Sequence, residues 1–95
     1  MNYRISKRAN RDIEAICDYI AKENPKAADN LDQRLHEQIK RLADMPALGH
    51  RRADVANQRY RFWVVGSYVI AYRIEHTALI VVRVLHGARD FRKLF

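Results

Sequence analysis

The chain has 95 residues, 48% of them hydrophobic, with 18 Lys and Arg against 11 Asp and Glu and a single cysteine. This size and composition predict one domain, residues 1–95, whose core needs no metal or disulfide. Because Cys17 is the single cysteine, an internal disulfide is excluded. No apolar run approaches the roughly 20 residues of a membrane helix, no signal-peptide core follows Met1, and the four histidines lack metal-ligand spacing, so we expect a cytoplasmic protein with no metal or cofactor.

A short strand and an amphipathic helix are expected at the start of the chain. Residues 3–5 alternate as a strand does, and Ser6 follows at the position of a helix N-cap. The next apolar residues are spaced by four, three and four positions, which places them on one face of a helix of about four turns. These residues are Ala9, Ile13, Ile16 and Ile20.

A second helix is expected after Asn24-Pro25, because Asn is a good cap and Pro is tolerated at the first helical position. Its apolar stripe runs through Ala28, Leu31, Leu35, Gln38/Ile39 and Leu42. With so short a link the two helices should form an antiparallel hairpin. An extended coiled coil is the alternative, although the stripe covers only two or so heptads.

Three antiparallel strands are expected in the second half, after a surface loop that begins near Met45. The strand-like runs are residues 59–65, 68–74 and 78–85, separated by Gly66-Ser67 and by residues 75–77. The whole pattern predicts an α+β fold, with a short N-terminal strand and an antiparallel helical hairpin packed on a C-terminal antiparallel β-meander.

The faces of this meander follow from its first turn. If Gly66-Ser67 is a two-residue turn, Val65 lies opposite Tyr68. One face then carries Arg61, Trp63, Ile70 and Tyr72, and the other carries Tyr60, Phe62, Val69, Ala71 and Arg73. Both faces are largely apolar, and one helical hairpin can bury only one of them. We therefore expect a bound partner on the second face, with the C-terminal segment folding back over it as the alternative.

The charge is concentrated in the same half. Residues 1–48 carry 9 Lys and Arg against 8 Asp and Glu, a net +1, whereas residues 49–95 carry 9 against 3, a net +6. Eight of these nine cations are arginines, which capture carboxylates and phosphates in a bidentate manner and stack on flat groups. The second half therefore predicts an acidic partner.

No motif of a hydrolase or nucleotide enzyme can be assembled from this sequence. The arginines with His86 and nearby aromatic residues suit three roles: binding RNA, cleaving RNA with His86 as a proton shuttle, or binding a protein. A structural role is the alternative for each residue. His86 would then cap a turn at the edge of the core, and Asp90 would form a local ion pair.

The chain resembles the ParE/RelE toxin superfamily across nearly its whole length. The resemblance is carried by Tyr60-Arg61, by residues 66–73 with their Tyr-x-x-x-Tyr spacing, and by Val84-Leu85-His86-Gly87-Ala88-Arg89-Asp90. Members are small basic toxins of bacterial type II toxin-antitoxin, or plasmid stabilisation, modules. The resemblance implies two helices packed on an antiparallel sheet and an antitoxin partner.

Two branches of the superfamily differ in activity. The RelE-like branch cleaves mRNA on the ribosome with lysines on the strand before the hairpin, an arginine after the first Tyr, and a phenol near the C-terminus. Those places here hold Tyr60 and Phe62, Val69, and Phe95, and only Arg89 matches a basic catalytic position. The His-Gly-Ala-Arg-Asp ending is instead similar to the ParE-like branch, whose members poison DNA gyrase.

The resemblance therefore implies a non-enzymatic gyrase inhibitor, held in a hetero-oligomer by a ParD-like, ribbon-helix-helix antitoxin. The antitoxin's acidic, amphipathic segment would lie in the groove between the hairpin and the sheet. A ribosome-dependent mRNA endonuclease using His86 and Arg89 is the alternative, an interaction module without toxicity is a third reading, and direct nucleic-acid binding is not favoured.

The residues expected to take part fall into two sets. Those expected to contact the target are Arg61, Arg73, Arg83, His86, Arg89, Asp90 and Arg92. Those expected to contact the antitoxin are Ile16, Ile20, Leu31, Leu35, Tyr60, Phe62, Trp63 and Tyr72.

Overall fold

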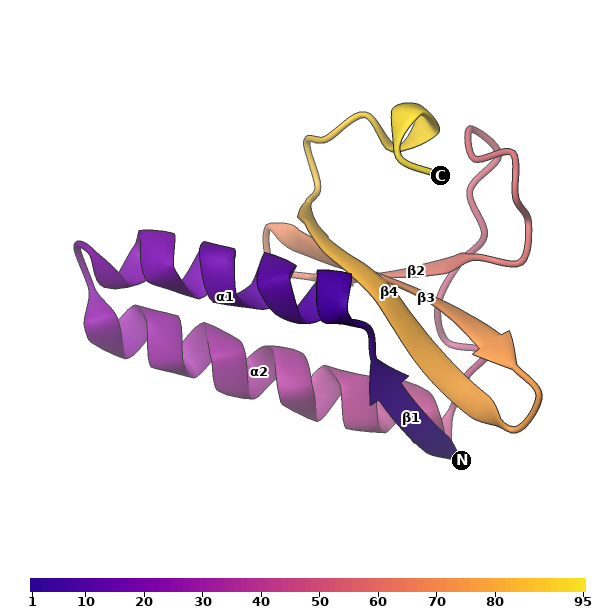
Figure 1. The fold of residues 1–95 in the computed structure, drawn as a ribbon, viewed down its shortest axis with the longest axis horizontal. Coiled ribbons are helices and arrows are strands. Elements are labelled where there is room, and N and C mark those ends of the chain that lie inside the picture. The colour runs from indigo at the N-terminus through magenta and orange to yellow at the C-terminus, as the bar shows by residue number, and fades with distance from the viewer.

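The computed structural model describes residues 1–95 and places two helices against one face of a four-stranded sheet (Figure 1). The elements are β1 (Asn2–Ile5), α1 (Lys7–Ala21), α2 (Pro25–Asp44), β2 (Arg61–Val65), β3 (Tyr68–Glu75), β4 (Ala78–His86) and a 3-10 helix, η1 (Phe91–Lys93). The α+β class and the order of its elements are as the sequence predicts. No helix has the length and apolar character needed to cross a membrane.

Both helices begin at the capping residues expected from the sequence. The Oγ of Ser6 accepts a hydrogen bond from the Ala9 N–H at 3.0 Å, and the Oδ1 of Asn24 accepts one from the Ala27 N–H at 3.0 Å. Pro25 is the first residue of α2, where a missing N–H costs no helical bond. The two helices lie side by side as the predicted hairpin (Figure 1).

The sheet has the order β1-β4-β3-β2, with β2, β3 and β4 antiparallel. Val65 lies opposite Tyr68, which confirms the register predicted from the two-residue turn. Gly66 in that turn has a φ of 60°, a conformation that glycine adopts without strain. β2 starts at Arg61, two residues later than expected, because the Tyr60 N–H bonds to the Asn57 carbonyl at 3.4 Å in the preceding loop.

β1 pairs in parallel with β4, which the local pattern could not predict. The pairing gives the meander a fourth strand and makes the sheet mixed. Beyond Val81, where β1 ends, β4 has no neighbouring strand on that edge and pairs only with β3. Ser6 begins to close this gap, since its N–H bonds to the Val81 carbonyl at 3.0 Å and its Oγ donates to the Val82 carbonyl at 3.2 Å.

The two faces of the sheet bury separate clusters of apolar side chains. The helix-covered face carries Ile70 and Tyr72, both fully buried, and the opposite face carries Val69 and Ala71, as the predicted register requires. The first cluster includes Ala9 and Ile13 of α1 together with Leu35, Ile39 and Leu42 of α2. The hairpin therefore packs on one face only.

The second face is covered by the chain itself. After β4 the C-terminal segment turns back over the sheet (Figure 1), and Phe91 of η1 is 1% exposed in a cluster with Val55 and Phe62. Leu94 and Phe95 pack against that cluster. The expectation that a bound partner covers this face was wrong, because the C-terminal segment supplies the apolar cover within the molecule.

Candidate functional site

Arg83 and Asp12 form the most extensive ion pair in the structure. The carboxylate of Asp12, on α1, accepts hydrogen bonds from the Nε and Nη2 of Arg83 at 2.7 and 3.1 Å. Asp12 also accepts the Val84 N–H at 3.0 Å, beyond the end of β1. At this edge of β4, Asp12 thus accepts a backbone hydrogen bond that a neighbouring strand would otherwise accept. The assignment of Arg83 to a target surface is corrected, because its side chain is 14% exposed and its guanidinium is engaged inside the molecule.

Arg61 is also held within the fold rather than presented to a target. Its Nη1 donates to the Gly49 carbonyl at 2.8 Å. The hydroxyl of Tyr72 accepts the Gly49 N–H at 2.8 Å and donates to the Pro46 carbonyl at 2.7 Å. Burial raises the pKa of Tyr72, and the Gly49 N–H and the Arg61 charge partly offset this effect. These contacts fasten the loop after α2 to the sheet.

The residues expected to contact an antitoxin divide by burial. Leu35 and Tyr72 are fully buried beneath the helices, and Phe62, 4% exposed, lies beneath the C-terminal segment. These three assignments are corrected, because the space between hairpin and sheet is the core itself and not an open groove, and the C-terminal segment covers Phe62 on the other face. The half-buried remainder consists of Ile16, Ile20, Leu31, Tyr60 and Trp63.

Trp63 lies at the boundary between β2 and α2. Its Nε1 donates to the Oε1 of Gln38 at 2.8 Å, and the guanidinium of Arg41 lies 5.8 Å from its ring centroid. Val64, the next residue of this edge strand, is 68% exposed. This edge strand therefore presents an aromatic ring beside a cation on the helix-covered face and an exposed apolar residue on the opposite face.

The turn that follows β4 retains the features expected of a contact surface. His86 is exposed, its Nδ1 accepts the Ala88 N–H at 3.1 Å, and its ring lies edge-on to Tyr68 with centroids 5.6 Å apart. The Gly87 N–H bonds to the Ser67 carbonyl at 2.9 Å, which joins this turn to the β2–β3 turn. Arg89 is exposed, and no side-chain hydrogen bond or ion pair engages its guanidinium.

Asp90 and Arg92 are paired with each other at the start of η1. The Oδ1 of Asp90 accepts the Arg92 N–H at 3.1 Å and lies 3.2 Å from its Nε. The hydrogen bond from the Arg92 side chain holds the pKa of Asp90 below its usual range. The local ion pair expected for Asp90 is confirmed. Within the turn, Arg89 is therefore the cation left free for a partner.

Arg52 is a structural residue that the sequence pattern did not reveal. Its guanidinium lies 4.3 Å from the ring centroid of Phe91 and 5.7 Å from that of Phe62. It also pairs with Asp54 at 2.9 Å. The loop before β2 and the C-terminal segment are thus held together by a cation over two rings. No periodicity marks Arg52, since its partners come from three separate parts of the chain.

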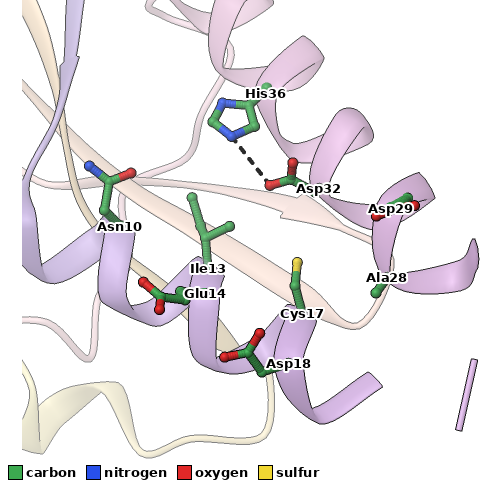
Figure 2. A pocket seen from close by; sticks show the side chains of 9 residues that line it. All are labelled: Asn10, Ile13, Glu14, Cys17, Asp18, Ala28, Asp29, Asp32 and His36. Atoms are coloured by element: carbon green, nitrogen blue, oxygen red, sulfur yellow. Dashed lines mark ion pairs between the residues drawn. The ribbon is translucent and has the colours of Figure 1, made fainter. Parts of the chain in front are cut away.

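The cleft between the two helices is acidic, which the near-zero net charge of the first half conceals. Figure 2 shows the carboxylates of Glu14, Asp18 and Asp32 near Cys17 and His36. These five residues are among those that line a cavity of about 330 Å³ between the helices. Burial, followed by the charges of Asp32, Asp18 and Asp29, raises the pKa of Cys17. Asp32 is paired with His36, at 3.3 Å. No group of three or more His, Cys, Asp or Glu side chains is arranged to hold a metal ion.

Comparison with known proteins matches most of the chain. Residues 3–91 match the family described as the ParE toxin of the type II toxin-antitoxin system, parDE. The chain is 38% identical over 82 residues to Toxin RelE2 of Caulobacter vibrioides, spanning 86% of this chain and 90% of that protein. It is 26% identical over 83 residues to Toxin RelE1 of the same organism, spanning 87% and 89%.

Two solved structures share the fold at low sequence identity. A chain of the chromosomal ParDE toxin-antitoxin system from P. aeruginosa superimposes with a TM-score of 0.78 at 20% identity, and one from the toxin-antitoxin complex RelBE2 of Mycobacterium tuberculosis with 0.59 at 21% identity. Each comparison covers 90% of this chain and 95% of the other. The arrangement of helices and sheet is therefore common to structures of both kinds.

Proposed function

This chain belongs to the ParE toxin family of type II toxin-antitoxin systems, and we propose that it arrests growth by inhibiting DNA gyrase without catalysing a reaction. The chain is the toxin of such a module. The choice of target is the finer question, because its relatives carry RelE names while the family model is that of ParE. The geometry of the second sheet face bears on that choice.

The covered second face is the observation that favours a non-enzymatic toxin. Phe95 takes the C-terminal position where the RelE-like resemblance implies a phenol, and its ring packs against Tyr60 and Phe62 with centroids 5.0 and 5.4 Å away. A phenyl ring cannot exchange a proton, and here it closes the face with Phe91. The exposed residues of the turn after β4, His86 and the unpaired Arg89, suit binding a protein surface.

A supercoiling assay with purified gyrase tests the target. We expect the wild-type protein to inhibit supercoiling and Arg89→Ala to need a concentration about tenfold higher, the loss typical of one charge-assisted contact. Arg11→Ala is the matched control, because Arg11 is an exposed arginine on α1 without an ion pair. Full gyrase activity at saturating wild-type protein would rule out this target.

An mRNA endonuclease is the second candidate. It is favoured by the RelE names of the relatives and by the proximity of His86 and Arg89. The backbone N–H of Arg89 bonds to the His86 carbonyl at 3.1 Å. Primer extension on translated messages after induction separates the two activities. New 5′ ends at ribosomal A-site codons, lost in His86→Ala, would establish the endonuclease. Uncleaved messages in cells that nevertheless stop growing would support gyrase as the target.

The antitoxin partner we propose is a ParD-like protein with an acidic segment. The carboxylates between the helices would repel such a segment, so we place it where β2 meets the end of α2, near Trp63 and Arg41. Binding of the cognate antitoxin should change Trp63 fluorescence and should weaken in Arg41→Ala. Lys22→Ala, at the far end of the hairpin, should bind as the wild type does.

A further inference from the structure

A row of side chains crosses the second face of the sheet outside the C-terminal cover. Arg4 of β1 is opposite Ile80 of β4, and Ile80 is opposite Arg73 of β3. Residues directly opposite one another in a sheet project to the same face. The two arginines therefore flank Ile80 on one face, although 68 residues separate them in the sequence.

These residues line a cavity of about 350 Å³ at the start of α1. Its lining consists of Arg4, Ile5, Ser6, Lys7, Arg73 and Ile80. Three cations from three elements thus meet at one opening. The N–H groups of Lys7 and Arg8, at the first turn of α1, have no hydrogen-bond partner in the structure, and the helix dipole adds positive potential there.

Only one carboxylate offsets this charge. Glu75 accepts hydrogen bonds from the Nε and Nη2 of Arg73 at 3.3 and 3.0 Å, which leaves the Nη1 of Arg73 and the whole of Arg4 and Lys7 without a carboxylate partner. The hydrogen bond from Arg73 is the main cause of the lowered pKa of Glu75, and Arg4 contributes through its charge. The cavity therefore keeps an excess of positive charge.

We propose that this cavity binds a phosphate group of a nucleotide or of a nucleic-acid backbone. Bringing Arg4, Lys7 and Arg73 together costs repulsion that an anion of more than one charge relieves. Arginine matches phosphate oxygens in a bidentate manner, and the free N–H groups at a helix start suit the same ligand. The volume is at the lower end for small-molecule sites, sufficient for a phosphate with part of its nucleoside.

The test is fluorescence anisotropy with a short fluorescein-labelled single-stranded DNA, with AMP and inorganic phosphate as competitors. We expect Lys7→Ala to raise the Kd about tenfold and to lower the salt dependence by about one counterion. Lys26→Ala is its matched control, a lysine in the first turn of the other helix, and should bind nearly as the wild type does. The control for Arg4→Ala is Arg59→Ala, because Arg4 and Arg59 are both exposed arginines without an ion pair.

Glu75→Gln should move affinity in the opposite direction, tightening binding about threefold to tenfold because the competing carboxylate is removed. Displacement of the DNA by AMP or inorganic phosphate would support a free phosphate ligand, and binding of DNA alone would support a backbone phosphate. Equal losses in Lys7→Ala and Lys26→Ala would show binding by diffuse charge and would overturn the proposal. If none of the three probes binds, the phosphate-site proposal is also overturned, whatever the outcome of the gyrase assay.

Discussion

Replacing Asp12 with alanine should destabilise the fold more than replacing its partner Arg83. Asp12→Ala removes the acceptor of three hydrogen bonds and leaves a guanidinium that is 14% exposed without a counter-charge. Breaking such a pair from one side, with the Val84 N–H also left open, should cost about 3 kcal/mol. For a domain of this size that lowers the Tm by roughly 15 °C.

Arg83→Ala should cost less, about 2 kcal/mol, because Asp12 keeps the Val84 N–H and has Arg8 nearby at 3.9 Å. The double variant should lose about 3 kcal/mol, no more than Asp12→Ala alone, since the pair is already broken. The coupling energy between the two residues is then about 2 kcal/mol. Arg8→Ala is the control, with 62% of its side chain exposed, and should cost under about 0.5 kcal/mol.

Urea unfolding followed by the fluorescence of Trp63, the single tryptophan, measures all four variants. Additive losses in the double variant would refute the assignment of Arg83 to the fold. A growth assay completes the test, because a structural Arg83 predicts that the folded fraction of Arg83→Ala remains toxic. Loss of toxicity at wild-type stability would return Arg83 to the target surface.

Three further outcomes follow from burial and hydrogen bonding. Phe91→Ala should cost about 3–4 kcal/mol in urea unfolding and half-buried Leu94→Ala under about 1.5 kcal/mol, because only Phe91 leaves a closed cavity; equal losses would contradict the packed tail. Tyr72→Phe should cost about 1–3 kcal/mol by the same measurement, since its hydroxyl both donates and accepts a hydrogen bond in the interior, and an unchanged midpoint would contradict those bonds. The raised pKa of Cys17 means that less of its thiol is ionised at mildly alkaline pH, so iodoacetamide should alkylate Cys17 more slowly in the folded protein than in the urea-unfolded protein. Asp32→Asn should increase the alkylation rate of the folded protein, because the charge of Asp32 contributes to the raised pKa. An unchanged rate in that variant would show that the Asp32 charge does not affect the thiol.

Local features of the fold could be predicted because the interactions that define them lie close together in the sequence. The Ser6 and Asn24 caps reach only three residues ahead, and each helix shows its buried face through spacing along its own turns. The Gly66-Ser67 turn sets the β2–β3 register, and the alternation of side chains then assigns the two faces.

Candidate residues were predicted less well, because an arginine in a basic half can serve either a partner or the fold. Arg61 and Arg83 are of the residue type expected on a binding surface, but their side chains make contacts within the fold. Arg89 stays free because the neighbouring Asp90 pairs with Arg92 instead. The acidic cleft of Figure 2 was missed because carboxylates spread along two helices cancel against lysines and arginines in a count of charge.

By itself the sequence determined the helices, their caps, the meander and the distribution of apolar residues between the two faces of the sheet. Only the tertiary structure decided what lies on those faces: the C-terminal segment over Phe62, the parallel pairing of β1, the contact of Asp12 with Arg83 across 71 positions, and the meeting of Arg4 with Arg73. The physical reason is range. Periodicity and capping depend on residues within a turn or two, whereas these contacts join distant segments whose approach is set by how the whole chain packs.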